Sequence, residues 1–320
     1  MHPGQYTVLN SPNPEVVNNA VSDLKYHAKV LDALGVNESS KIILHIGGVY
    51  GDKQKSAEVF KSNYLKLPDN IKARMIIEND DKNYAVEDIL DISRALEIPV
   101  VFDNLHNELN PSKEELSGKE WIGICASTWK KKDGKQKIHY SQQKAGASVG
   151  SHSETIYIEE FMEFYNSLND KSIDIMLEVK DKNISCLKCI NSTCDKASIK
   201  DIEEEWARYK YLVLSRSARV YEEIRELLKD KKDMNVIEFY KKIELALHMA
   251  EDKGAEVNAA QHVWEYLGKN CKEADKRRFD RLIRYYAENG KGLKSIKSHL
   301  LKCTEAQNVE YLKNSYYFFI

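Results

Sequence analysis

The segment KIILHI at residues 41–46 decides the fold, because its apolar side chains follow one another without the alternation that a solvent-exposed face would impose. Such a run, rich in β-branched residues, is typical of a strand buried on both faces of a parallel sheet. Further segments share this pattern. They are Arg74–Glu78, Ile98–Asp103, Trp121–Ala126 and Asp174–Val179. We predict a parallel strand at each of these positions.

Amphipathic stretches with helical periodicity separate the strands. They are Pro14–Leu34, Ser56–Leu67, Ala85–Leu96 and Ile158–Leu168. Asn13 and Pro14 are a favourable N-cap and first-turn residue for the first helix. Strands and helices alternate at spacings of roughly 25–35 residues, which is typical of βα units. The first part of the chain is therefore predicted to be an α/β domain.

The pattern becomes almost wholly helical after about residue 190. The predicted helices are Glu203–Ser217, Ala218–Lys229, Val236–Ala250, Ala259–Gly268, Lys272–Asn289 and Gly292–Leu301. The charged stretch 195–205 is the expected boundary. We therefore predict two domains, residues 1–195 and residues 203–320, of which the second is all-α.

Composition and charge exclude several classes of protein. Mean hydropathy is −0.55, and no apolar run reaches the about 20 residues of a membrane span. The N-terminus lacks the pattern of a signal peptide, and the six cysteines lack the spacing of a disulfide framework, so a cytoplasmic protein is expected. Residues 1–195 carry a net charge of −6 and the remainder +4. This excess of acids argues against DNA binding driven by bulk charge, unless metal ions neutralise part of it.

Ligand-type side chains stand at the ends of the predicted strands. His45, Glu78, Asp103 and Glu178 close their strands, and His106 follows shortly after Asp103. His139 and His152 fall in a long loop region after Trp121–Ala126, and His2 opens the chain. In a βα barrel the carboxyl ends of the strands meet at one mouth. Any one of these residues alone is more simply a structural residue, but together they predict a site for Zn²⁺ or Mn²⁺.

Several motifs, in this order and spacing, resemble the UV-damage endonuclease family from Met1 to about residue 190. They are HPGQYTVLNSPN, LHIGGVYGDK, IENDD, VVFDNLHNE, KIHYSQQ, VGSHSETI and MLEVKDKN. The resemblance implies a TIM-type (β/α) barrel. It also implies a metal-dependent DNA repair endonuclease that nicks damaged double-stranded DNA immediately 5′ to UV photoproducts, without ATP.

The resemblance also implies a site with up to three divalent ions, namely Mn, Zn or Mg. Its ligands would be His2, His45, Glu78, Asp103, His106, His139, His152 and Glu178. Glu78 would bridge two ions. His2 and His45 would serve the first ion, Asp103, His152 and Glu178 the second, and His106 and His139 the third.

Further residues receive roles from the same resemblance. Glu78, Lys137 and Glu178 would be catalytic, and Lys137 matches a family lysine near the third ion, where a carbamylated side chain would supply negative charge. Gln5 and Tyr6 match the pair that the family inserts into the damaged duplex. The implied reaction is metal-assisted phosphodiester hydrolysis.

The sequence departs from the family at its start. Family members begin with two more strands and another histidine, whereas this chain begins at the tail of the third strand. We therefore predict a barrel that lacks its first strands, with exposed strand edges and impaired activity. The alternatives are a metal-dependent sugar isomerase or epimerase on a related barrel, and an inactive fragment.

The second domain resembles the helical YbgA-type family of unknown function. The likeness rests on EEWARYKYLVLSRS, AAQHVWEYLGKN and YLKNSYYF. The positive side chains between Lys276 and Arg284 are interpreted as a solvated helix face, with DNA phosphates as the alternative partner. Cys186, Cys189 and Cys194 are interpreted as ordinary thiols, and His248, His262 and His299 as surface or packing residues. The oligomeric state is not predicted.

Overall fold

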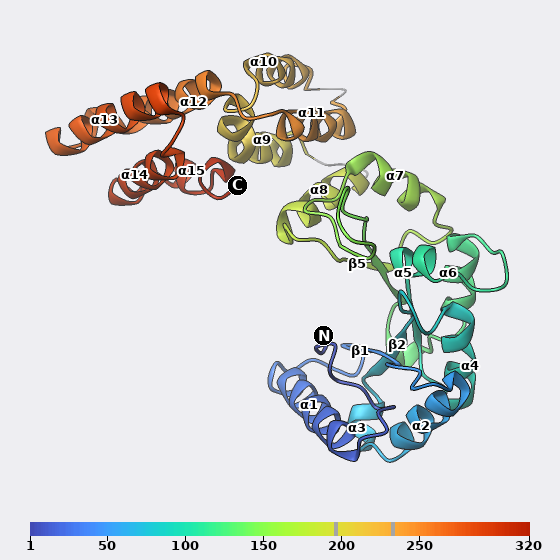
Figure 1. The fold of residues 1–320 in the computed structure, drawn as a ribbon. Helices are drawn as coiled ribbons and strands as arrows, with labels where there is room; N and C mark the ends of the chain where they lie inside the picture. The colour runs from blue at the N-terminus through green and yellow to red at the C-terminus, as the bar shows by residue number, and fades with distance from the viewer. Residues whose placement is uncertain (195–197, 232–233) are drawn as a thin grey trace. The chain divides into compact units, whose positions relative to one another are not determined.

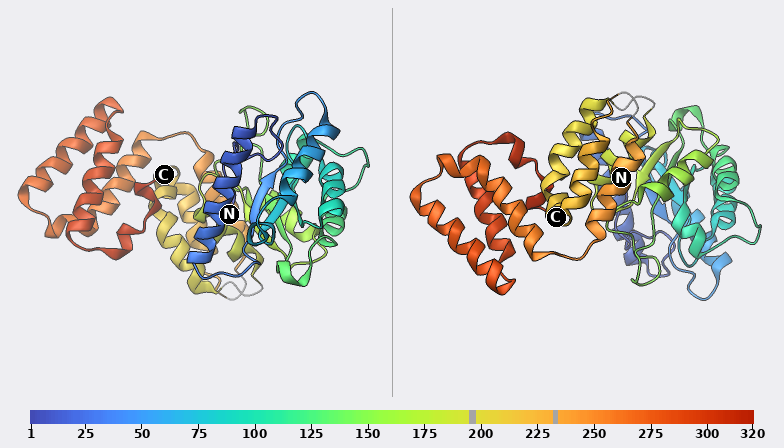
Figure 2. Two further views of the ribbon diagram at one scale, coloured as in Figure 1. Left: turned by 90° about the horizontal axis from the view of Figure 1, so that it is seen from below. Right: turned by 90° about the horizontal axis from the view of Figure 1, so that it is seen from above.

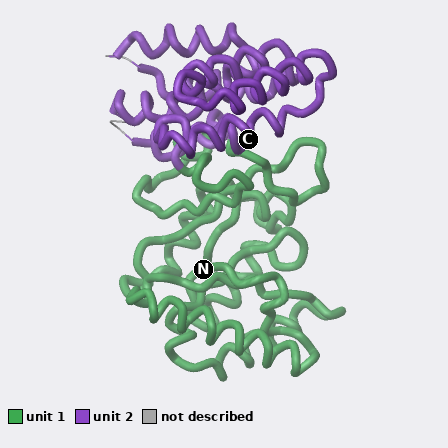
Figure 3. The backbone as a smooth tube through the Cα atoms, turned by 90° about the vertical axis from the view of Figure 1, so that its left-hand side faces the viewer, with its two compact units in different colours: residues 1–156, 163–186 green, residues 157–162, 187–320 purple. Residues whose placement is uncertain are grey.

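The computed structural model describes residues 1–194, 198–231 and 234–320, so the expected boundary at 195–205 begins on residues outside this description. Two compact units are present, and Figure 3 colours them separately. Unit 1 comprises Met1–Ile156 and Glu163–Cys186, and unit 2 comprises Tyr157–Met162 and Leu187–Ile320.

Unit 1 is built on a parallel sheet whose strands follow one another in chain order, β1-β2-β3-β4-β5 (Figure 1). The strands are β1 (Ile42–His45), β2 (Met75–Glu78), β3 (Val100–Asp103), β4 (Lys137–Tyr140) and β5 (Asp174–Leu177). His45 pairs in register with Glu78, and Asp103 pairs with His139. The predicted α/β class is confirmed, and the register brings ligand-type residues to one level at the carboxyl ends of the strands.

Most helices of unit 1 cover one face of this sheet. They are α1 (Pro14–Ala33), α2 (Lys53–Leu65), α3 (Asp69–Lys72), α4 (Val86–Leu96) and α6 (Gly118–Ala126), whereas α5 (Asn104–Leu109) directly follows β3 at its carboxyl end. The unit boundary passes through α7 (Ile158–Ser167) and α8 (Asn183–Thr193). Asn13 caps α1 as predicted, since its side chain accepts a hydrogen bond from the Glu15 backbone N–H. Buried side chains of the helices, such as Leu24 and Phe60, pack against alternate strand residues such as Leu44 and Ile77.

The other face of the sheet carries a separate, smaller apolar layer. Ile43, Ile76 and Val101 form it, with Trp129 against them. Because side chains on one face of a strand recur every second residue, the next residues on this face are His45, Glu78 and Asp103. The apolar layer thus lies directly below the layer of ligand-type residues.

The prediction of a strand at Trp121–Ala126 is wrong, because these residues belong to helix α6. Ser117 and Glu120 form a capping box at its start, and Trp121, Ile122 and Cys125 point into the core with helical spacing. The fourth strand is β4, which lies within the region predicted as a long loop. His139 is therefore a strand residue and not a loop residue.

The N-terminal residue lies beside β1 in the manner of a parallel neighbour. The Met1 amino group donates to the Lys41 carbonyl at 2.6 Å, and the Ile43 backbone N–H donates to the Met1 carbonyl at 2.9 Å. Bonds to residues on either side of Ile42 are the pattern of parallel pairing. These bonds fix the backbone that precedes His2.

Unit 2 is helical, as predicted. Its helices are α9 (Ile199–Leu214), α10 (Ala218–Leu227), α11 (Val236–His248), α12 (Lys253–Leu267), α13 (Glu273–Asn289), α14 (Leu293–Ala306) and α15 (Glu310–Lys313), with short 3₁₀ turns η2 (Gly268–Asn270) and η3 (Tyr316–Phe318). α9 packs against α10, α11 and α12, and the two views of Figure 2 show α13 beside α14. Among the described residues, none of the helices combines the length and apolarity needed to cross a membrane.

A buried ion pair anchors the start of β1 and provides a test of the sheet. Lys41 Nζ lies 2.6 Å from Asp133 Oδ1 with both side chains almost fully buried, and it also donates to the Ala73 carbonyl. We expect Lys41→Ala to lower the unfolding free energy by about 3–5 kcal/mol, because it leaves a buried carboxylate without its cation. Native-state hydrogen exchange of the β1 and β2 amides measures this change. The control is Lys53→Ala, which removes an exposed pair with Asp88 and should cost less than about 1 kcal/mol. Equal losses in the two variants would contradict the role assigned to Lys41.

Candidate metal centre

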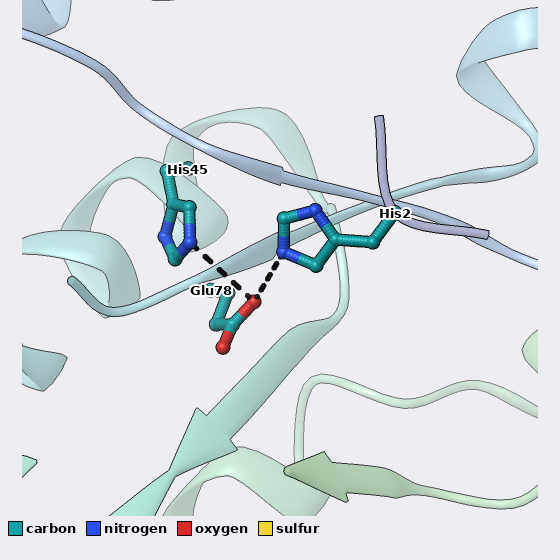
Figure 4. A group of neighbouring side chains, drawn as sticks. All are labelled: His2, His45 and Glu78. Carbon is teal, nitrogen blue, oxygen red and sulfur yellow. Dashed lines mark hydrogen bonds and ion pairs between the residues drawn. The ribbon is translucent and has the colours of Figure 1, made fainter. Parts of the chain in front are cut away.

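Glu78 lies at the centre of the site. It is the last residue of β2, and its side chain is fully buried. Its Oε2 atom lies 3.1 Å from His2 Nε2 and 3.9 Å from His45 Nε2, and Figure 4 shows both imidazoles directed at this oxygen. The three ligand-type atoms are close enough together to hold one ion.

The second oxygen of Glu78 faces two more imidazoles. Oε1 lies 2.9 Å from His139 Nδ1 and 3.6 Å from His106 Nδ1. One buried carboxylate therefore has histidines from four separate segments around it. A carboxylate with donors beside both oxygens can bridge two ions.

Two further carboxylates complete the cluster. Glu178 lies 3.0 Å from His139 Nδ1 through Oε1 and 3.6 Å from His152 Nδ1 through Oε2. Asp103 Oδ1 lies 3.8 Å from His106 Nδ1. The structure thus brings together all eight residues that the sequence analysis names as ligands.

The grouping of these residues agrees only in part with the predicted assignment to three ions. His2, His45 and Glu78 form one group, as expected for the first ion. The other two groups are Glu78 with Asp103 and His106, and Glu78 with His139 and Glu178. The assignment predicted from the sequence instead groups Asp103 with His152 and Glu178, and His106 with His139.

Local hydrogen bonds hold the ligands in place. Asp103 Oδ1 accepts from the His106 backbone N–H at 2.8 Å, so the first turn of α5 fixes His106 above the end of β3. His152 forms an isolated antiparallel bridge with Gln143, which closes the loop between them and returns the chain to the site. Asp103 and His152 are therefore fixed by the backbone as well as by their own side chains.

Two asparagines that the sequence analysis did not single out fasten neighbouring strand ends. The Asn79 side chain accepts from the Asp103 backbone N–H at 2.9 Å and donates to the Asp103 carbonyl at 3.1 Å. Asn104 makes the same two bonds to Ser141, just beyond β4. Each asparagine directly follows a carboxylate ligand, in the dipeptides Glu78–Asn79 and Asp103–Asn104. That repeated dipeptide is the signal that could have identified them.

The charges of the cluster compensate one another. Burial opposes ionisation of Glu78, but His139 above all, with His2 and His45, lowers the pKa of Glu78 well below its ordinary value. Burial likewise opposes the charged form of His139, yet Glu78 and Glu178 raise its pKa well above the ordinary value. The carboxylates therefore favour the charged form of His139, and His139 in turn favours the charged form of Glu78.

Asp103 behaves differently from Glu78. Burial, together with the Glu78 charge, raises the pKa of Asp103 to about 6, against the effect of His106. Its Oδ2 atom is buried and has no hydrogen-bond partner among the described residues, and the same holds for His45 Nδ1 and His139 Nε2. An unsatisfied buried polar atom costs about 1–3 kcal/mol. Nitrogen and carboxylate atoms left in this state fit a site for Zn²⁺ or Mn²⁺.

The remaining site residues of the sequence analysis lie beside the cluster. Lys137 lies two residues before His139 on the same face of β4, where Nζ is 3.1 Å from Asp174 Oδ2 and 5.6 Å from the centre of the Trp129 ring. It belongs to none of the four ligand groups found in the described part of the chain.

Gln5 and Tyr6 lie at the tip of a turn. The turn is closed by a 2.9 Å bond from the Thr7 N–H to the Gly4 carbonyl, and Tyr6 is 82% exposed. Both residues line a cavity of about 710 Å³ that His45 also lines. An exposed aromatic residue thus stands on the rim of a pocket that reaches His45, a residue of the candidate metal centre.

Comparison with known proteins assigns both parts of the chain. The family model described as UV-endonuclease UvdE matches residues 1–210, and a model described as a protein of unknown function (DUF1722) matches residues 210–320. A UV DNA damage endonuclease of Clostridium perfringens is 44% identical over 256 residues, which are 79% of this chain and 61% of that protein. One of Bacillus cereus strain Q1 is 38% identical over 204 residues, 63% of each chain.

A solved structure agrees with these matches. The crystal structure of SacUVDE superposes with a TM-score of 0.56 at 44% identity, over 60% of this chain and 63% of that one. The TIM-type fold is thereby supported for unit 1. The present chain spans about three fifths of the length of these relatives. Since the family model covers most of the sequence, the chain belongs to the UV-endonuclease UvdE family.

Proposed function

We propose that this chain is a metal-dependent endonuclease that nicks damaged double-stranded DNA immediately 5′ to UV photoproducts. The observation that carries the proposal is the buried Glu78 carboxylate with imidazoles beside both of its oxygens. Family membership and the names of the relatives support a nuclease. We further propose a cytoplasmic location, in keeping with the free thiols of the described cysteines.

The proposed metal site takes its ligands from the whole cluster. The ligands are His2, His45, Glu78, Asp103, His106, His139, His152 and Glu178. We propose that His2, His45 and Glu78 hold one divalent ion and that the remaining residues hold up to two more. Mn, Zn and Mg are the candidate ions, and the imidazole content favours Mn or Zn.

Each part of the cluster has a distinct role in the proposed reaction. When bound, such ions lower the pKa of a coordinated water and stabilise negative charge on the phosphate. Glu78 and Asp103 are fully buried and keep the ligands together, whereas the Glu178 side chain is 21% exposed and can accept a proton from water. Lys137 is retained as a proposed catalytic residue, because it lies on the same strand face as His139.

Gln5 and Tyr6 are proposed to contact the lesion. Their turn projects an exposed aromatic ring next to the pocket at His45, as a wedge into unstacked bases requires. A damaged duplex costs less to deform than an intact one, so such recognition does not need a broad basic surface. Recognition of this kind is compatible with the net charge of −6 of residues 1–195. The wedge of Gln5 and Tyr6 also favours a nuclease over a sugar isomerase.

The first test of the proposal is strand cleavage. We expect the chain with Mn²⁺ to nick an irradiated duplex oligonucleotide and to leave the unirradiated one whole. Glu78→Gln should lower the rate at least about a hundredfold, because it removes the charge that the three ligand groups of the cluster share. Denaturing electrophoresis measures the product. Glu58→Gln, on the exposed surface of α2, is the matched control and should keep full activity. An intact strand with the unmodified chain contradicts the proposal.

Tyr6→Ala tests the proposed wedge. We expect the affinity for irradiated duplex to fall roughly 5–150-fold, since stacking on one base contributes about 1–3 kcal/mol. Fluorescence anisotropy measures binding, and the affinity for Mn²⁺ should not change. Tyr26→Ala removes another exposed tyrosine, on α1, and should bind like the unmodified chain. If Tyr6→Ala weakens binding to damaged and undamaged duplex equally, Tyr6 does not recognise the lesion.

Asn79→Ala tests the fastening of β2 to β3. We expect the affinity for Mn²⁺ to fall about 10–100-fold, as for other residues that orient metal ligands through hydrogen bonds. Titration followed by electron paramagnetic resonance of free Mn²⁺ measures it. Ser93→Ala is the control, because it also removes a buried hydrogen bond, to the Ile98 carbonyl just before β3. A similar loss of Mn²⁺ affinity in both variants would mean that Asn79 acts only through stability.

A further inference from the structure

A second group of ligand-type residues lies in unit 2, between α13 and α14. Asp275, His299 and Cys303 each offer an atom, and these atoms lie within 4.8 Å of one another. Cys303 Sγ is 3.9 Å from His299 Nε2, and both side chains are buried. None of these residues belongs to the metal centre of unit 1.

Cys271 is a second thiol near this group, although its Sγ is not one of the atoms that lie within 4.8 Å of one another. It lies between η2 and α13, four residues before Asp275, and its Sγ accepts a hydrogen bond from Gln307 Nε2 at 3.1 Å. Burial and the neighbouring Cys271 thiol raise the pKa of Cys303 to about 12. Gln307 follows the end of α14, four residues after Cys303, so its bond to Cys271 Sγ places both cysteines near this end of the helix, and both are free in this structure.

We propose that Cys271, Asp275, His299 and Cys303 form a structural Zn²⁺ site that joins α13 to α14. His299 and Cys303 have the i, i+4 spacing that places two side chains on one face of α14, whereas Cys271 precedes α13 and Asp275 lies in its first turn. Zn–S and Zn–N bonds at the tetrahedral angle place sulfur and nitrogen about 3.6 Å apart. The 3.9 Å between Cys303 Sγ and His299 Nε2 is close to that value.

Packing alone does not account for this arrangement. The centre of the His299 ring lies 6.2 Å from that of Trp264, and Trp264 stacks on Phe279 at 4.3 Å, in keeping with the interpretation of His299 as a packing residue. The edge of the His299 ring lies near the Cys303 thiol and the Asp275 carboxylate. His299 Nε2 now lies 3.1 Å from the Asp275 carbonyl. Coordination through Nε2 requires the ring proton on Nδ1, and the thiols release their protons when the ion binds.

Cobalt distinguishes this site from the centre in unit 1. The unit 1 cluster contains imidazoles and carboxylates only, whereas the proposed Zn²⁺ site contains two thiols. A sulfur-to-cobalt charge-transfer band in the near ultraviolet therefore reports on thiolate coordination alone. Titration of the full reduced chain with Co²⁺ should produce this band with saturation at one thiolate-bound ion, and Zn²⁺ should abolish it.

Variants assign the band to the residues named. We expect the sulfur-to-cobalt band to be absent in Cys303→Ser and in His299→Gln. It should also be absent in Cys271→Ser, whose half-buried position should leave the helical circular dichroism unchanged. Cys186→Ser removes an exposed thiol on α8 and should leave the band unchanged. Glu78→Gln should also leave it unchanged, so that failure of the unit 1 proposal does not affect this one.

Several outcomes would overturn the proposed Zn²⁺ site. One is the absence of the band in the unmodified chain, and another is its persistence in Cys271→Ser. Loss of the band in Cys186→Ser would assign it to the cysteines of α8. A melting temperature of unit 2 that Zn²⁺ does not raise would show that no ion stabilises its folded form.

Discussion

The burial of the Glu78 charge is the constraint on which the rest of unit 1 depends. A fully buried carboxylate remains ionised only where hydrogen-bond donors or positive charge lie beside it. Ring nitrogens of His2 and His139 lie 3.1 Å and 2.9 Å from the Glu78 oxygens, and they come from the N-terminal segment and from β4. Those two segments can reach Glu78 only because Met1 pairs with β1 and because parallel register aligns β1 to β4. The site can therefore form only if the strands of the sheet have this order and register.

Strand periodicity explains why much of this site could be predicted from the sequence. His45, Glu78 and Asp103 each end an apolar run, and parallel strands bring such ends to one edge. The residues two positions earlier, Ile43 and Ile76, pack in the apolar layer below. A single polar residue at the end of a buried strand is thus sufficient to place the site at the carboxyl edge of the sheet, even where the positions of the helices are unknown.

The same rule failed at β4 for a physical reason. Lys137 and His139 occupy the face that carries the site, so β4 has few apolar residues and lacks the signal of a buried strand. The apolar run Trp121–Ala126 carries that signal instead, although Ser117 and Glu120 cap it as a helix. Strands that contribute most to a polar centre are thus the hardest to find by hydropathy. The roles of Asn79 and Asn104 could not be predicted from the sequence, because both side chains bind backbone groups that only the folded sheet brings near.

The two proposed metal sites differ in their donor atoms, and this bears on how one chain could load different ions. Affinities of most sites rise toward Cu²⁺ and Zn²⁺, so a site keeps Mn²⁺ only if oxygen ligands and geometry favour it. The centre in unit 1 includes the carboxylates of Glu78, Asp103 and Glu178, which suit Mn²⁺. The group in unit 2 includes the thiols of Cys271 and Cys303, which suit Zn²⁺. Because the two sets of donor atoms differ, the two proposed sites need not select the same ion from a mixture of divalent metals.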